Sequence, residues 1–303
     1  MRELCGGLGL ELVVLTTPRR GFSRYALLTT RTMALLFRRR PDVLLIQNPS
    51  LILATLAVLL RSVLGFSVVV DAHNEAVEPY IHSSPIVRRL AHWVIKRSDL
   101  TIVTNRQLAH IVEAAAGRPF VLPDRIPDPP DGRVTAPLTS GFNLVLIATY
   151  AKDEPVAAVF EAVRDLPVQL YATGNPDKLD QSVRAGLPSN VTLTGFLPEQ
   201  EYWALLRAAD AIIDLTTMDN CLVCGAYEAL ALGKPMVLSG NAACEELFGV
   251  AALYVDNTSS SIRSAIQRLQ MGEASREAID ERRRALMDQW TRSASVLGAR
   301  LAS

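Results

Sequence analysis

One acidic side chain stands at the start of a helix that follows a strand and a loop. Ala211–Leu215 is predicted to be a short apolar strand, Thr216–Val223 a polar loop and Gly225–Leu232 a helix. A loop that feeds a helix N-terminus presents unpaired backbone N–H groups, which suit an anion such as a diphosphate. Glu228 falls on the first helical turns and faces the same opening, where the loop enters the helix. A carboxylate does not suit phosphate, but it can accept hydrogen bonds from the two hydroxyls of a ribose.

The same segment continues into a second strand, which makes it a βαβ unit. The helix is predicted to end at Gly233, before strand Met236–Leu238. In such a unit a ligand binds where the loop meets the helix. We therefore expect the loop to line a ligand with Cys221, Leu222 and Val223.

Two of the four cysteines, Cys221 in this loop and Cys224 directly after it, have a Cys-x-x-Cys spacing. That spacing also occurs in redox and zinc sites, which are the alternatives here. Zinc requires more ligands, and no histidine lies nearby in the sequence. We expect two small side chains beside a ligand loop in a reducing cytosol, with no metal bound.

The composition describes a globular protein with a large core. Of its 303 residues, 49% are hydrophobic and 20% charged, and the length suits two domains. The formal net charge is zero, so nothing in it favours a nucleic-acid partner. The start, Met1-Arg-Glu-Leu-Cys, lacks the apolar core of a signal peptide. The longest apolar run, Leu51–Leu60, is shorter than the about 20 residues that span a bilayer, so we expect a cytoplasmic protein.

Strands and helices alternate along the chain, which predicts α/β architecture with parallel sheets covered by helices. In the first half we expect strands at Leu10–Thr16, Val43–Gln47, Phe66–Asp71, Leu100–Thr104 and Phe120–Leu122. The segment Pro123–Ser140 is rich in Pro, Asp and Gly, which is typical of a linker between domains.

A second α/β domain is predicted to begin at strand Asn143–Ala148. It continues with helix Pro155–Asp165, for which Asp153 or Glu154 would be the N-terminal cap. A long helix, Ser275–Leu297, is predicted near the end of the chain.

The segment from Asn220 to Ser239 resembles the donor-binding signature of the retaining nucleotide-sugar glycosyltransferases of family 4, which have the GT-B fold. The family pattern is Glu, seven residues, Glu, a helix and then Gly-Thr/Lys-Pro. The second Glu matches Glu228, whereas the first falls on Asn220. The resemblance implies two Rossmann-like domains whose parallel sheets face each other across a cleft. It also implies a ribose contact at Glu228 and a contact with the transferred sugar at Asn220.

The resemblance extends over nearly the whole chain and implies its domain bounds. Residues 1–135 would form the N-terminal, acceptor-side domain and residues 141–275 the nucleotide-sugar-binding domain. Residues 276–303 would form a helix that crosses back to the first domain. Met1-Arg-Glu-Leu-Cys-Gly resembles the tail of a helix that the family places after a first strand and a Gly-rich loop, so that strand is expected to be missing.

Two further residues match positions at which the family contacts its donor. His73 follows the strand Phe66–Asp71 and resembles the family's histidine that contacts the donor sugar; the alternatives are a capping or core histidine, or a metal site with Asp71. Lys152 takes the place of a cationic pair that the family uses for the phosphates; the alternative is a solvated loop side chain. We assign His73, Lys152 and Asn220 as the catalytic candidates.

The remaining candidates follow predicted strands of the second half. Gly174 and Asn175 end the strand Gln169–Thr173, where Gly permits close approach of a ligand to the backbone. Phe196 and Leu197 resemble the family's Gly-hydrophobic segment, which receives the base through backbone groups. With Glu228 and the loop residues above, they form the predicted donor site.

The resemblance implies transfer of a hexose from a UDP- or GDP-sugar to a glycan or lipid-linked acceptor, with retention, in cell-envelope or exopolysaccharide synthesis. Nucleotide sugar is then the donor substrate, and no cofactor is expected. Arg38-Arg39-Arg40 is expected to be a solvated helix end, or else a contact with anionic lipid at the inner face of the membrane. The alternatives to transfer are a sugar-nucleotide 2-epimerase and a non-catalytic protein that binds nucleotide sugars.

Overall fold

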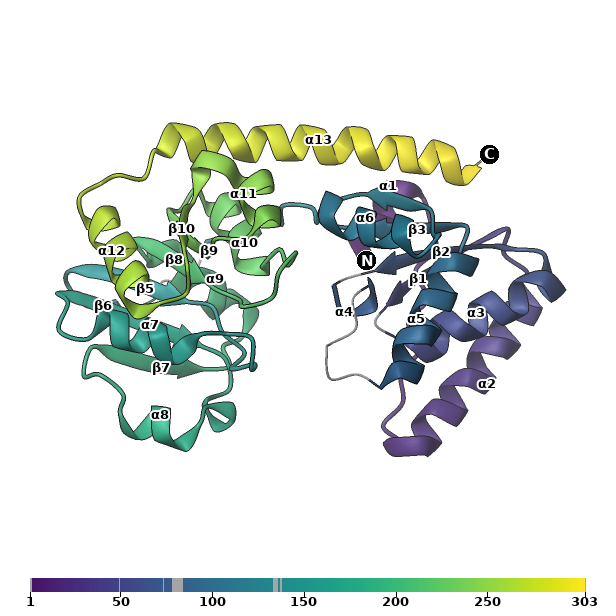
Figure 1. The fold of residues 1–303 in the computed structure, drawn as a ribbon, viewed down its shortest axis with the longest axis horizontal. Coiled ribbons are helices and arrows are strands. Elements are labelled where there is room, and N and C mark those ends of the chain that lie inside the picture. The colour runs from purple at the N-terminus through teal and green to yellow at the C-terminus, as the bar shows by residue number, and fades with distance from the viewer. Residues whose placement is uncertain are drawn as a thin grey trace. The chain divides into compact units, whose positions relative to one another are not determined.

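The computed structural model describes residues 2–48, 50–72, 74–77, 84–132, 136 and 138–302. The predicted site residue His73 therefore lies outside the described residues. The chain divides into two compact units, which we describe one by one (Figure 1). The first comprises Met1–Asp124 and Trp290–Ser303, and the second comprises Arg125–Gln289.

The first unit contains a four-stranded parallel sheet in the order β1-β2-β3-β4 (Figure 1). Its strands are β1 (Val43–Asn48), β2 (Ser67–Ala72), β3 (Leu100–Val103) and β4 (Pro119–Val121). Its helices are α1 (Arg2–Leu8), α2 (Gly21–Arg39), α3 (Leu51–Leu64), α4 (Asn74–Val77), α5 (Pro85–Arg97), α6 (Arg106–Ala114) and the C-terminal part of α13 (Arg276–Ala302).

Side chains of β2 alternate between two apolar layers, because successive residues of a strand point to opposite faces. Val68 and Val70 pack with buried residues of α2, α3, α5 and α6. Val69 packs on the other face with Leu4 of α1 and Leu297 of α13. Coverage on both faces explains why this strand has an unbroken apolar sequence.

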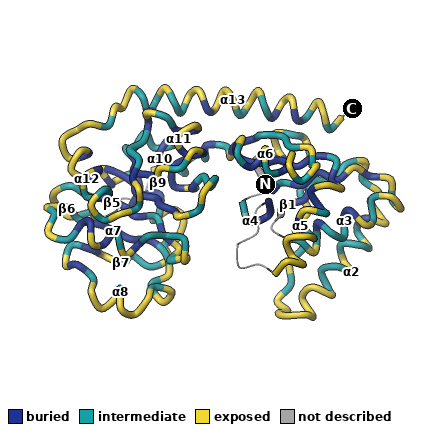
Figure 2. The backbone as a smooth tube through the Cα atoms, in the orientation of Figure 1, coloured by how far each residue is buried: buried dark blue, intermediate teal, exposed yellow. Residues whose placement is uncertain are grey.

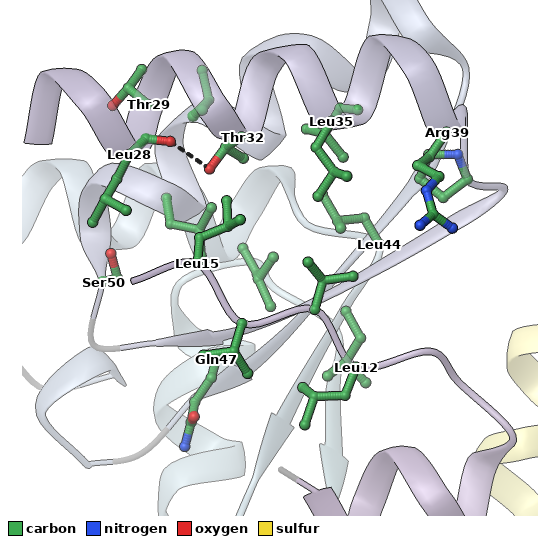
Figure 3. A pocket seen from close by; sticks show the side chains of 18 of the residues that line it. Leu12, Leu15, Leu28, Thr29, Thr32, Leu35, Arg39, Leu44, Gln47 and Ser50 are labelled. Carbon is green, nitrogen blue, oxygen red and sulfur yellow. Dashed lines mark hydrogen bonds between the residues drawn. The ribbon is translucent and has the colours of Figure 1, made fainter. Parts of the chain in front are cut away.

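The predicted strand Leu10–Thr16 is wrong: the structure places no strand there. A strand requires a hydrogen-bonded neighbour, and β1 pairs only with β2 among the described strands. Residues 10–15 and β1 instead line one cavity of about 810 Å³, which is also lined by α2 and the start of α3. Figure 3 shows side chains around it, including Leu12 and Leu15 from the segment and Leu44 from β1.

The second unit contains a six-stranded parallel sheet in the order β10-β9-β8-β5-β6-β7 (Figure 1). The strands are β5 (Phe142–Leu146), β6 (Val168–Thr173), β7 (Val191–Gly195), β8 (Ala211–Asp214), β9 (Met236–Ser239) and β10 (Leu253–Val255). The helices are α7 (Val156–Val163), α8 (Gln181–Ala185), α9 (Glu199–Ala208), α10 (Cys224–Leu232), α11 (Ala242–Phe248), α12 (Ser259–Gln270), the N-terminal part of α13, and the short 3-10 helices η1 (Pro176–Lys178) and η2 (Gly249–Ala251).

Two helical layers cover this second sheet. Leu144 and Leu146 of β5 face α7 and α12, whereas Val145 faces α9, α10, α11 and α13. The strands β5, β8 and β9 are almost wholly buried, while α8 lies at the surface (Figure 2). The predicted linker begins this unit, and its Ile126 is buried in the core on the α9–α10 face.

The order of the strands decides where a ligand site can form. From β5 the chain adds β6 and β7 on one side, then returns to add β8, β9 and β10 on the other side. In open parallel sheets, ligands bind at such a switch point, outside the carboxyl ends of the two strands. Here those strands are β5 and β8. None of the helices in the described part of the chain is long and apolar enough to cross a bilayer.

Candidate functional site

The loops that follow β5 and β8 meet at the switch point of the second sheet. The hydroxyl of Thr216 donates to Asp153 Oδ2 at 3.0 Å, and the backbone N–H of Thr217 donates to the Asp153 carbonyl at 2.7 Å. The N–H of Thr216 donates to Ser239 Oγ, at the end of β9, at 2.9 Å. These bonds join three strand ends into one surface.

The start of helix α10 packs closely against the end of β8, because Gly225 has no side chain. Its N–H donates to Asp214 Oδ2 at 2.8 Å. A Cβ at position 225 would lie 2.6 Å from Asp214 Oδ2 and 2.6 Å from Ile147 Cδ1, closer than real Cβ contacts come. Burial raises the pKa of the Asp214 carboxyl well above its usual range. Val223, the residue before the helix, makes no side-chain capping bond, so the helix N-terminus opens onto the loop.

Glu228 lies one turn into α10 and is held by a residue of α9. The hydroxyl of Tyr202 donates to Glu228 Oε2 at 2.5 Å. Burial raises the pKa of the half-buried Glu228 carboxyl, and the Tyr202 bond partly opposes that shift. Among the described residues, no hydrogen bond reaches Glu228 Oε1. The helix ends at Gly233 in the left-handed conformation (φ 63°), as the sequence predicts.

The loop after β5 folds back on a carboxylate instead of beginning a capped helix. Glu154 accepts hydrogen bonds from the N–H of Thr149 (2.9 Å to Oε2), the Thr149 hydroxyl (2.7 Å) and the N–H of Ala151 (3.3 Å). The prediction that Asp153 or Glu154 caps α7 is therefore wrong. The cap residue is Pro155, which makes no side-chain capping bond.

The glycine after β6 is required by its backbone conformation and by close contact with this loop. Gly174 has φ 96°, and a Cβ there would lie 2.2 Å from the Ala148 carbonyl oxygen and 3.3 Å from the Tyr150 ring. The Tyr150 hydroxyl is buried with no partner among the described residues, and burial raises its pKa to about 12. Asn175, the next predicted residue, accepts the N–H of Asp177 at 3.0 Å and so caps η1.

The other predicted donor-site residues follow strands at the same edge. Lys152 lies exposed in the loop after β5. After β7, Phe196 is 89% exposed, while Leu197 packs against the core beneath α9 and α10. Asn220 sits in the loop after β8 with φ 52°, a left-handed conformation that Asn tolerates better than Glu.

The cysteines in and beside this loop are thiols and form no disulfide. The Cys221 carbonyl accepts bonds from Asn241 Nδ2 at 3.1 Å and Cys244 Sγ at 3.3 Å. Burial raises the pKa of the Cys221 thiol to about 12 and that of Cys244 to about 11, so neither is a thiolate near neutral pH. Cys224 is exposed and free of a disulfide. No cluster of three metal-ligating side chains occurs in the parts of the chain that are described.

The structure thus gathers Lys152, Gly174, Asn220 to Val223 and Glu228 along one edge of a single sheet. The sequence did not predict that Tyr202 and Glu154 belong to the candidate site at this edge. Neither has a sequence signal of its own, because their roles depend on contacts across 26 residues for Tyr202 and a folded-back loop for Glu154.

Comparison with known families finds two matches, one in each half of the chain. Residues 2–127 match the glycosyl transferase 4-like domain, and residues 141–271 match the family described as glycosyl transferases group 1. No curated protein matches the sequence at a significant level.

Several solved structures are similar in fold. HepE from Anabaena, in complex with UDP and glucose, is 16% identical with a TM-score of 0.75, over 100% of this chain and 89% of that chain. Sucrose-phosphate synthase from Thermosynechococcus elongatus is 17% identical with a TM-score of 0.72, over 95% and 80%. A glycosyltransferase from Rickettsia africae is 8% identical with a TM-score of 0.69, over 100% and 88%. At these identities the likeness concerns the fold alone.

Proposed function

We propose that this glycosyltransferase, which has two Rossmann-like domains of the GT-B type, transfers a hexose from a nucleotide sugar with retention. Its first half matches the glycosyl transferase 4-like domain and its second half matches the glycosyl transferases group 1. The donor is a UDP- or GDP-sugar, and the acceptor is a glycan or a lipid-linked glycan of the cell envelope or an exopolysaccharide. The observation that carries this proposal is Glu228, held by Tyr202 beside the open N-terminus of α10 at the switch point.

Glu228 is the ribose-binding residue in this proposal. Tyr202 fixes Oε2, so Oε1 keeps a set direction and can accept a hydroxyl hydrogen. Burial makes such a bond stronger than it would be in water. In support, structures of the similar HepE contain UDP or UDP-glucose.

The diphosphate is proposed to bind where the loop after β8 enters α10. The backbone of Cys221 to Val223 lies at the helix N-terminus, where the helix dipole favours negative charge. Lys152 would add a cation from the loop after β5. Gly174, Asn175, Phe196 and Leu197 would surround the base and sugar, and Asn220 would contact the transferred hexose. His73 keeps the sugar-contacting role that its sequence position implies.

Retention in this scheme needs no protein nucleophile. The leaving diphosphate and the acceptor share one face of the sugar, so the protein must stabilise developing charge and exclude water. We propose that the donor substrate suffices without a further cofactor. A cytoplasmic protein that works at the membrane surface would fit α2, whose Phe22 is exposed and whose last turn carries Arg38 and Arg39.

Calorimetry with UDP and GDP tests the site. Glu228→Ala is expected to weaken nucleotide binding at least tenfold, the scale of one lost buried hydrogen-bond pair. The control is Glu201→Ala, which removes an exposed carboxylate from α9 and should leave affinity unchanged. Asn220→Ala is expected to alter the preferred sugar more than the nucleotide affinity. Unchanged UDP and GDP affinity in Glu228→Ala would defeat the ribose assignment.

A sugar-nucleotide 2-epimerase is the second candidate, and two observations favour considering it. A putative UDP-N-acetylglucosamine 2-epimerase from Listeria monocytogenes has a similar fold (13% identity, TM-score 0.58). Asp153, Glu154, Asp214 and Glu228 also supply carboxyl groups around the switch point. Epimerisation or hydrolysis of UDP-N-acetylglucosamine in the absence of any acceptor would decide for that reaction over transfer.

A further inference from the structure

We infer that Glu154 determines the affinity of this site for phosphate, because its carboxylate already occupies the N–H groups of Thr149 and Ala151 and the Thr149 hydroxyl, which could otherwise bind an anion. The inference rests on the proposed nucleotide-sugar site. It adds an internal competitor that the donor's diphosphate must displace.

The first observation is the set of contacts around the carboxylate. Three donors of the loop converge on Glu154: the N–H and the hydroxyl of Thr149 and the N–H of Ala151, at 2.7 to 3.3 Å. Tyr150, between them, has φ 58°, and the N–H groups of Thr149 and Ala151 both donate to Oε2 of Glu154. Successive N–H groups in such a turn form a concavity that binds anions.

The second observation is where this concavity lies. The loop follows β5, the strand at the switch point, and packs against Gly174 after β6. It is joined to the loop after β8 through Asp153, Thr216 and Thr217. The donors that Glu154 occupies therefore lie at the same strand ends as the N-terminus of α10, where the diphosphate is proposed to bind.

The third observation is the sign of the charge. Glu154, Glu228 and Asp153 are close enough to Asp214 to contribute to its raised pKa, after burial and in that order. Four carboxyl groups thus lie around the switch point, and the predicted phosphate cation, Lys152, is exposed. Like charges at a few ångströms repel by more than the free energy of a tenfold change in affinity once water is partly excluded.

Displacing the carboxylate leaves its partners in place. The backbone of the loop is held by bonds that do not involve the Glu154 side chain, including Thr217 N–H to the Asp153 carbonyl and Glu154 N–H to the Ala151 carbonyl. The donors would therefore remain arranged for an incoming phosphate after the side chain has turned away.

The test compares Glu154→Gln with the unaltered chain by calorimetry, using inorganic pyrophosphate, UDP, UMP and uridine as probes. Glutamine keeps the length and one acceptor of the side chain but removes its charge. We expect pyrophosphate and UDP to bind about tenfold more tightly, UMP to gain less and uridine to gain nothing. The matched control is Glu161→Gln on α7, which removes the same charge from an exposed ion pair with Arg164 and should change none of the four.

The outcomes separate this inference from the proposed function. If UDP binding depends on Glu228 but is equal or weaker in Glu154→Gln, the competitor role is overturned while the nucleotide site stands. If no nucleotide binds either protein, yet pyrophosphate affinity rises in Glu154→Gln, the nucleotide site fails and the role of Glu154 stands. Thermal melting verifies folding, and Thr149→Val, which removes one of the three donors, should raise pyrophosphate affinity less than Glu154→Gln does.

Discussion

Replacing Gly225 with alanine tests whether α10 is held against the end of β8 as closely as the structure shows. Helix propensity alone predicts that alanine stabilises a helical glycine position by about 1 kcal/mol. The structure predicts the opposite sign, because the new Cβ would lie 2.6 Å from both Asp214 Oδ2 and Ile147 Cδ1. Asp214 is buried and its Cβ would also lie only 3.0 Å from the new Cβ, so α10 must shift away from the strand.

The magnitude follows from two losses and one gain. Overpacking of a tight site costs about 1–3 kcal/mol. Lengthening the Gly225 N–H bond to buried Asp214 costs about 1 kcal/mol more, and the propensity gain offsets about 1. We expect a net loss of about 1–3 kcal/mol. For a unit the size of Arg125–Gln289, each kcal/mol lowers Tm by about 2–4 °C.

Scanning calorimetry is the assay, since it resolves separate transitions for separate units. The matched control is Gly6→Ala in α1, where a Cβ meets nothing within 4 Å, so that variant should melt at the same temperature or slightly higher. A Gly225→Ala protein as stable as the unaltered chain would refute the close packing. Weakened UDP binding in Gly225→Ala is expected as well, because the shift moves the helix N-terminus.

Two further predictions concern stability and exchange. Burial raises the folded pKa of Asp214 above its unfolded value, so its contribution to stability is complete below the unfolded pKa and is lost as pH rises through the folded pKa. Asp214→Asn keeps an acceptor for the Gly225 N–H but has no carboxyl group to ionise. Its urea midpoint should therefore fall less steeply than that of the unaltered chain as pH rises. An equal slope in the two proteins would contradict the raised pKa of Asp214. Hydrogen exchange should be much faster at the amides of residues 10–15 than in β2, because only β2 has neighbouring strands on both sides. Equal protection of the two segments would show that residues 10–15 are paired after all.

Local sequence predicted the strands that are buried on both faces. Val68 to Val70 and Leu144 to Leu146 are short apolar runs whose alternate residues pack into two separate cores. The same reasoning failed at Leu10–Thr16, which has the composition of a strand. Composition describes the fit of side chains to a sheet, but pairing also requires a neighbouring strand, and here residues 10–15 line a cavity together with β1 without pairing to it (Figure 3).

The candidate site shows the same contrast between what local sequence predicts and what tertiary contacts decide. The sequence by itself determined the strand–loop–helix unit that ends at Gly233 and the position of Glu228 on its first turns, because capping residues and helical spacing act within a few residues. Only the tertiary structure decided that Tyr202 orients Glu228, that Asp214 holds Gly225 and that Glu154 turns back onto Thr149 and Ala151. Those choices depend on which donors each carboxylate meets, and a donor's position in space is not encoded in the spacing of residues along the chain.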